Sequence, residues 1–213
     1  MKIIMKKIIV LLFLIIPSQV MAQNINDKIT HLIYFTARCC PNCQKVSPKL
    51  LEKDILKADY LVFEYELRGN DENNKLFKKY IDDFKVANGV PVLITGNNKN
   101  FSIIGGQPIL DKFNEITTSN QGIPIIFPNG VASSFERLDL TKMPALPSIW
   151  YKNKIAIKKD IKSQANESIK EFLLKGNLPL NSVQTKNVYV NIAGKSVEFK
   201  KAYKFNGWIL MYR

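Results

Sequence analysis

The chain is poor in cysteine. Its 213 residues include only Cys39, Cys40 and Cys43, which lie within one five-residue segment. A disulfide framework needs cysteines spread along the chain, so this distribution excludes one. A structural zinc site would need a fourth ligand from elsewhere. The single histidine, His31, starts a predicted strand, and we expect it to be an ordinary strand residue rather than a ligand.

Acidic residues are scarce relative to basic ones. The sequence holds 18 Asp and Glu against 31 Lys and Arg, which gives a formal net charge of +13. Lysine supplies most of this charge, and no basic motif is interleaved with aromatic residues. We therefore interpret the basic residues as a solvated surface and expect no nucleic-acid partner. A polyanion-binding surface is the less favoured alternative.

A long apolar run occurs at the N-terminus. Three lysines precede the run over residues 8–16, and the ending Val20-x-Ala22 suits signal peptidase. Even extended to Ala22, the run is about 15 residues long, short of the roughly 20 that a membrane-spanning helix needs. We therefore expect residues 1–22 to be a cleaved signal peptide, with no stable membrane span. The mature chain would be periplasmic or otherwise extracytoplasmic.

Hydrophobic periodicity predicts an alternation of strands and helices over residues 28–117. The predicted strands are Ile29–Ala37, Tyr60–Leu67, Val90–Thr95 and Phe101–Ile104. The predicted helices are Asn42–Leu56, Asn73–Phe84 and Pro108–Thr117. The order is β-α-β-α-β-β-α, which indicates an α/β domain over residues 23–117.

Residues 118–213 give weaker signals. They contain a strand-like run with a hairpin turn at 148–154, a helix-like segment at 166–175, and strand-like runs at 188–192 and 202–212. This region holds no cysteine, no acid pair and no glycine-rich phosphate loop. We expect an additional α+β region, either a degenerate second module or a docking domain that recognises a partner.

Cys40 and Cys43 form a C-x-x-C motif where a buried strand gives way to a helix-like pattern. This arrangement is used for thiol–disulfide exchange. Cys40 precedes the helix, where unpaired N–H groups and the helix dipole favour a thiolate. We therefore predict that Cys40 is the attacking thiolate. Cys43 lies about one turn further on, close enough to resolve a mixed disulfide.

We predict that neighbouring residues modulate the reactivity of the Cys40–Cys43 pair. Pro41 loses no intrahelical hydrogen bond at a helix start, and Asn42 adds an uncharged polar donor. Arg38 is a candidate to stabilise the thiolate, with ordinary solvation as the alternative. Adjacent cysteines cannot form a relaxed disulfide. We therefore expect Cys39 to be a small apolar residue beneath the site, with a third redox thiol as the alternative.

Other uses of C-x-x-C fit the sequence less well. Covalent haem attachment requires a histidine after the second cysteine, and this chain has Gln44 there. A copper(I) site made by the two thiolates stays open as an alternative. We predict no cofactor and no metal.

The order of elements and three local motifs resemble the thioredoxin superfamily, and the local likeness is greatest to glutaredoxins. The matching segments are residues 34–48 (YFTARCCPNCQKVSP), 89–93 (GVPVL) and 104–106 (IGG). The resemblance implies a thioredoxin-like fold with a mixed sheet flanked by helices. It also implies a cis peptide bond before Pro91, with the backbone of Val90 offered to an extended substrate.

Some positions depart from these families. The lysine that grips glutathione in cytosolic glutaredoxins is Ala37 here, and the position of the buried acid of thioredoxins is Tyr34. Pro147 is the alternative cis-proline, if the fold is one thioredoxin domain with a large insertion, as in the Dsb family of periplasmic oxidoreductases.

Two classes of function follow as expectations. The first is an extracytoplasmic thiol:disulfide oxidoreductase that acts on protein thiols and disulfides of exported clients, with a membrane redox partner as a further candidate. The second is a redox-active assembly factor of an envelope secretion or conjugation machine. The sequence leaves open the direction of electron flow, because it depends on the relative stability of thiolate and disulfide.

Overall fold

The structure is a computed structural model that describes residues 29–53, 59–96, 101–128, 130–132, 134–192 and 195–213. The predicted signal peptide at residues 1–22 lies outside the described residues. The end of the first predicted helix, beyond residue 53, lies outside them too. Within the described ranges, no helix is long and apolar enough to cross a membrane.

Helices and strands alternate in the first region, and strands dominate the second. The helices are α1 (Pro41–Pro48), α2 (Asp71–Phe84), α3 (Gly106–Ser119), α4 (Glu167–Lys175), the π-helix η2 (Lys49–Lys53) and the 3₁₀ turn η3 (Phe135–Arg137). The strands are β1 (Thr30–Thr36), β2 (Tyr60–Glu66), β3 (Val92–Ile94), β4 (Ser102–Ile104), β5 (Ile125–Phe127), β6 (Gly130–Ala132), β7 (Ser148–Tyr151), β8 (Lys154–Lys158), β9 (Val183–Thr185), β10 (Val188–Ile192), β11 (Lys195–Phe199), β12 (Lys201–Phe205) and β13 (Trp208–Tyr212).

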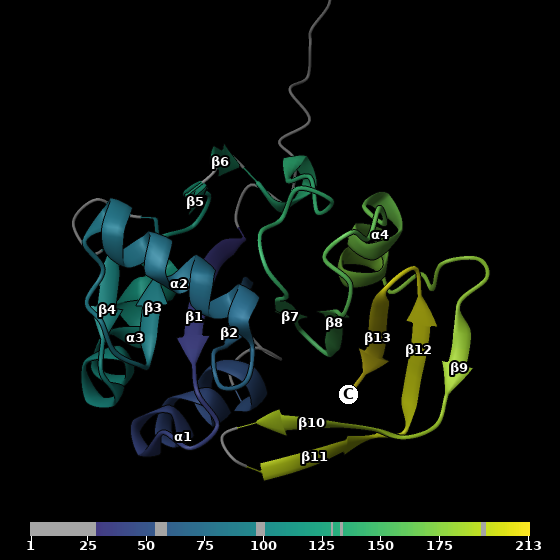
Figure 1. The fold of residues 1–213 in the computed structure, drawn as a ribbon, viewed down its shortest axis with the longest axis horizontal. Coiled ribbons are helices and arrows are strands. Elements are labelled where there is room, and N and C mark those ends of the chain that lie inside the picture. The colour runs from purple at the N-terminus through teal and green to yellow at the C-terminus, as the bar shows by residue number, and fades with distance from the viewer. Residues whose placement is uncertain (1–28, 54–58, 97–100, 129, 133, 193–194) are drawn as a thin grey trace, which may run out of the picture.

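Nine strands form one mixed sheet in the order β4-β3-β1-β2-β7-β8-β13-β12-β9 (Figure 1). β1 and β2 are parallel, and the other neighbouring pairs are antiparallel. The chain order β1-α1-β2-α2-β3-β4-α3 confirms the order predicted for residues 28–117. The prediction of a mixed α/β protein is therefore confirmed.

Helices cover both faces of the sheet. One core combines β1 and β2 side chains such as Phe35 and Phe63 with the apolar faces of α2 and α4. The other combines Tyr34 and Val62 with α1, η2, α3 and the β10–β11 hairpin. In Figure 1, α2 crosses in front of β1 and β2. Because both faces are covered, all seven residues of β1 are buried.

The second region continues the sheet of the first. β7 pairs with β2, with Leu61 beside Tyr151 and Glu64 beside Ser148. The predicted hairpin at residues 148–154 is confirmed, because β7 and β8 pair across a two-residue turn. The boundary near residue 117 thus separates two parts of one nine-stranded sheet, and the roles of the two parts stay predictions.

The run at 202–212 was predicted as a single strand-like segment, and this is wrong. It contains the antiparallel strands β12 and β13, with Phe205 paired to Trp208. Asn206 and Gly207 turn the chain with φ of 41° and 78°. Asn-Gly suits such a turn because both residues tolerate positive φ.

The first helix differs from its predicted form at both ends. It begins at Pro41, and the α-helical part ends at Pro48. Proline has no N–H to donate to the preceding turn, so regular hydrogen bonding cannot continue through it. The described chain goes on as the π-helix η2.

His31 is a buried residue of β1, and neither ring nitrogen has a hydrogen-bond partner among the described residues. Burial lowers its pKa to about 4. The backbone of Ile123 faces the ring and opposes this shift, without a hydrogen bond of normal geometry. The neutral imidazole is thus the folded form over most of the acidic range.

This burial predicts an acid-dependent loss of stability. As pH falls from about 6.5 towards 4, the unfolded chain binds a proton at His31 that the folded chain does not, so the contribution of His31 to the unfolding free energy should fall by up to about 3 kcal/mol. Denaturant titrations of wild type and His31→Leu over this range test it. The two proteins should differ in slope, and parallel profiles would assign the acid sensitivity to other groups.

Candidate functional site

Cys40 is the N-cap of α1. Its backbone is extended, with φ of −92° and ψ of 115°, and its sulfur accepts a hydrogen bond of 3.1 Å from the Cys43 N–H. Pro41 follows at the first helical position, and the Gln44 N–H donates to the Cys40 carbonyl at 3.1 Å. The predicted placement of Cys40 at a helix start is confirmed.

Cys40 and Cys43 are joined by a disulfide, with their Cα atoms 5.2 Å apart. Cys43 is buried at 1% exposure, whereas Cys40 is only half-buried. An incoming sulfur therefore has better access to Cys40. This agrees with the predicted roles of attacking and resolving cysteine, which stay predictions.

Cys39 is a free, exposed thiol. The expectation that it lies beneath the site is wrong. The Cys40 N–H donates to the Ala37 carbonyl at 3.1 Å, which closes a turn over residues 37–40 before the helix begins. In that turn Cys39 points to solvent, away from the apolar layer that buries Cys43.

The Val90–Pro91 peptide bond is cis, and it is the only cis bond among the described residues. The Cys40 sulfur lies 3.5 Å from the Val90 carbonyl oxygen. The predicted cis-proline is thus confirmed at Pro91 and not at Pro147. Pro91 is buried, and Val90 is half-buried at the edge of the disulfide.

Gly105 and Gly106, at the start of α3, close the other side of the site. Gly105 has φ of 95°, which favours glycine, and its N–H donates to the Pro91 carbonyl at 2.9 Å. A Cβ on Gly106 would lie 3.2 Å from both the Cβ and the carbonyl oxygen of Asn42. Gly106 therefore lets α3 approach the residues between the two cysteines.

Of the three residues predicted to modulate the cysteine pair, two lie beside the disulfide and the third, Arg38, is hydrogen-bonded to a neighbouring loop. Pro41 and Asn42 are exposed beside the disulfide. The Arg38 guanidinium donates to the Arg68 carbonyl at 3.0 Å, in the loop after β2. Its observed hydrogen bond therefore leads away from the sulfurs, and its effect on a thiolate stays a prediction.

Sequence reasoning missed Glu64. This carboxyl lies in β2 directly beside Tyr34 of β1 and is fully buried on the α1 side of the sheet. The Trp150 indole N–H donates to it at 2.8 Å. Burial raises its pKa to about 8, the indole opposes this rise, and Glu66 adds to it. Alternation in Tyr60–Glu66 places Glu64 on the same face of the strand as Tyr60 and Val62, and these two apolar neighbours were the available signal that this face is buried.

Glu64 and Tyr34 form a polar patch beneath α1. The Tyr34 hydroxyl lies 2.9 Å from the Ser47 hydroxyl, one turn after Cys43 on α1. Burial raises the pKa of Tyr34, so this hydroxyl stays protonated. Because its pKa lies near neutral pH, Glu64 can hold or release a proton there.

Comparison of the chain with protein-family models, curated proteins and solved structures finds no match. The fold and the site by themselves define an α/β protein with a large mixed sheet and a disulfide at a helix start. Among the described residues, no three His, Cys, Asp or Glu side chains gather as a metal site.

Gly106→Ala should disturb the site while leaving the sheet intact. The added methyl presses on Asn42 and shifts the first turn of α1, which weakens the N–H contact to the Cys40 sulfur. We expect exchange of the disulfide with a small thiol to slow by about fivefold, since one such hydrogen bond contributes on the order of 1 kcal/mol. Stopped-flow kinetics measure this, with Gln107→Ala on the exposed face of α3 as control. Equal rates in both variants would contradict the role of Gly106.

Glu64 predicts a loss of stability at alkaline pH. Its folded pKa exceeds its unfolded pKa, so its contribution is full below about 4.5 and is lost as pH rises towards 8. Between pH 7 and 8, where His31 is largely neutral in both states, the unfolding free energy should fall by about 1 kcal/mol. Glu64→Gln should flatten this decline, and Glu115→Gln, an exposed α3 control, should not. An unchanged slope in Glu64→Gln would assign the proton to another group.

Proposed function

We propose that the chain is an extracytoplasmic thiol:disulfide oxidoreductase of thioredoxin-like fold that exchanges disulfides with protein cysteines. The observation that carries the proposal is the Cys40–Cys43 disulfide at the start of α1, with its outer sulfur 3.5 Å from the carbonyl before a cis-proline. Export through the predicted signal peptide at residues 1–22 is part of the proposal.

The topology supports the fold assignment. The first region pairs in the order β4-β3-β1-β2, with β1 parallel to β2 and antiparallel to β3. The pair of cysteines follows β1, and the cis-proline precedes β3, the neighbour of β1. This arrangement brings the two motifs together at one end of the sheet, as the thioredoxin superfamily requires.

The exchange runs through a mixed disulfide. The Cys40 thiolate attacks one sulfur of a client disulfide, a Cys40–client bond forms, and the other client sulfur leaves as a thiolate. Cys43 then loses its proton and attacks the Cys40 sulfur. The Cys40–Cys43 bond forms, and the second client thiolate is released. The same steps in reverse oxidise a client dithiol.

Backbone around the site supports these roles. The helix start favours negative charge on Cys40, and the Cys43 N–H already points at that sulfur. Val90 is half-buried next to it, and we assign its backbone to an extended client. Glu64 is the titratable group that we assign to proton transfer beneath α1.

The alternative is a redox-active assembly factor of an envelope machine. It is favoured by the size of the second region, which adds five strands of its own to the nine-stranded sheet. A dedicated factor should show little exchange with generic client proteins, whereas an oxidoreductase should turn them over.

Trapping experiments test the proposed roles. With a disulfide-bonded model protein, Cys43→Ala should accumulate mixed disulfides on Cys40 at least about tenfold more than Cys40→Ala, because the thiolate favoured at the helix start attacks and no resolving thiol remains. Non-reducing gels and mass spectrometry measure the adducts. Cys39→Ala in each background controls for the exposed third thiol. Equal trapping by Cys40→Ala and Cys43→Ala would falsify the assignment.

A further inference from the structure

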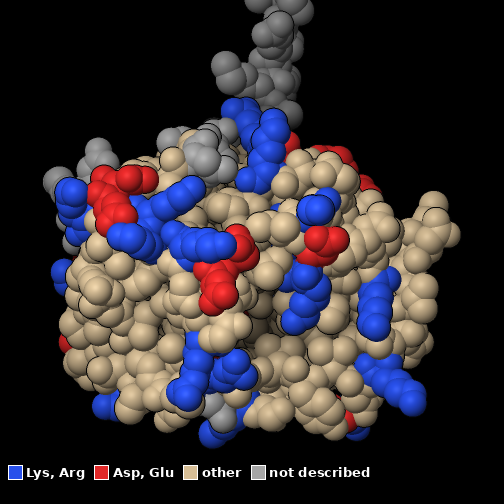
Figure 2. All heavy atoms as spheres, in the orientation of Figure 1, with Lys and Arg blue, Asp and Glu red and all other residues tan. Residues whose placement is uncertain are grey.

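Positive charge is concentrated in the second region. Residues 118–213 hold 15 Lys and Arg against 6 Asp and Glu, whereas residues 23–117 hold 13 against 12. In Figure 2 the coloured side chains over β12 and β9 are mainly blue. The region with the cysteines is thus nearly neutral, and the region without them attracts anionic partners.

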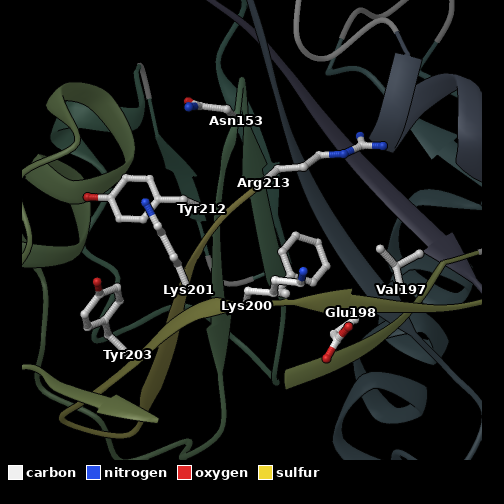
Figure 3. A pocket seen from close by; sticks show the side chains of 9 residues that line it. Asn153, Val197, Glu198, Lys200, Lys201, Tyr203, Tyr212 and Arg213 are labelled. Atoms are coloured by element: carbon white, nitrogen blue, oxygen red, sulfur yellow. The ribbon is translucent and has the colours of Figure 1, made fainter. Parts of the chain in front are cut away.

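A cavity of about 660 Å³ opens in this basic region, and we call it the lysine–tyrosine pocket. It lies where the end of β11 and the start of β12 face the end of β13 and the β7–β8 turn. Phe199, Tyr203 and Tyr212 give it an aromatic lining, and Lys200 and Lys201 give it charge. In Figure 3, Lys201 extends alongside Tyr212, with Tyr203 on the same side of the cavity.

The two lysines carry the free charge of the pocket. Both are exposed, and neither makes an ion pair within the described chain. Arg213, by contrast, is held by Glu52 at 3.7 Å. The one carboxylate side chain among the lining residues, that of Glu198, accepts hydrogen bonds from the side chains of Asn187 and Tyr189.

The pocket lies at the opposite end of the first helical segment from Cys40. Arg213, part of its rim, donates to the carbonyls of Leu51 and Glu52 at 3.4 and 2.9 Å. Leu51, which Arg213 contacts, lies eleven positions after Cys40, which at a rise of about 1.5 Å per residue is roughly 16 Å. An extended chain covers that distance with about five residues.

We propose that the lysine–tyrosine pocket binds an acidic, extended segment of the client protein, which places a cysteine about five residues away at Cys40. The proposal rests on the proposed function and names its substrate class. Lys200 and Lys201 bind client carboxylates, and the aromatic lining takes an apolar side chain between them. A concave pocket with this lining suits a peptide rather than a flat lipid surface.

In the exchange with a reduced client, the client thiolate attacks the Cys40 sulfur. A client–Cys40 bond forms, the Cys40–Cys43 bond breaks, and Cys43 leaves as a thiolate that takes a proton from water. Docking in the pocket raises the local concentration of the client cysteine without changing this chemistry.

Two synthetic peptides test the proposal, each with one cysteine separated by about five residues from an Asp/Glu-rich or a Lys-rich segment that contains a phenylalanine. The oxidised full-length mature protein should react with the acidic peptide about tenfold faster at low salt, and high salt should remove most of this preference. Lys200→Glu/Lys201→Glu should abolish the preference. Lys162→Glu/Lys186→Glu, matched in charge but outside the pocket, should keep most of it.

The outcomes separate docking from chemistry. If the two peptides react at equal rates, or if both double variants lose the preference for the acidic peptide equally, the docking role of the pocket is wrong. Exchange with uncharged 2-mercaptoethanol should continue in that case. Failure to exchange with every thiol overturns the proposed function itself. A further experiment measures binding of the protein to vesicles that contain anionic lipids. If Lys200→Glu/Lys201→Glu loses vesicle binding but reacts normally with the acidic peptide, the lysines serve a membrane surface, and the proposal is wrong.

Discussion

The hydrogen bond from the Trp150 indole to Glu64 ties the candidate site to the second region of the chain. It spans 86 positions at 2.8 Å and supplies the partner of a fully buried carboxyl. A buried polar group left without its partner costs about 1–3 kcal/mol, and an ionised one costs more. Trp150 reaches Glu64 only because β7 pairs with β2, and β7 is held in turn by β8 and α4. The polar patch beneath α1 therefore depends on residues that carry none of the cysteine chemistry.

Because of this dependence, the two regions are not structurally independent of each other. A fragment that ended near residue 117 would leave the β7 side of β2 unpaired and would leave Glu64 without its donor. Unpaired strand edges attract other chains. Chemistry and recognition can still be distinct, since the disulfide and the lysine–tyrosine pocket lie at opposite ends of one helical segment. They are distinct sites on a shared sheet, however, and the folding of one region supports the other.

The sequence predicted the first region well, because its signals are local. Alternation in Tyr60–Glu66 and the apolar face of α2 can be read without tertiary contacts, and cysteine, proline and glycine carry backbone requirements of their own. The prediction that Cys39 is buried was wrong because the exposure of this side chain depends on the turn over residues 37–40, which the composition does not reveal. Glu64 was missed because an inward acid looks like an error until its donor is known, and Trp150 is remote in sequence. The pairing of β7 with β2 also joins segments that are remote in sequence, so local signals could not predict it.

Under the proposed function, selectivity among clients would follow from how charge is divided between the two regions. The proposed thiol–disulfide exchange at Cys40 would depend on thiolate fraction and access, and these hardly distinguish an acidic client from a basic one. The nearly balanced charge of residues 23–117 adds little preference, so any discrimination by charge has to come from residues 118–213. Within that region Lys200 and Lys201 combine exposure with an aromatic-lined cavity, which lysines on an open surface lack. In the proposed docking mode, a helical segment of fixed length between the pocket and Cys40 would convert a charge preference into a spacing requirement on the client.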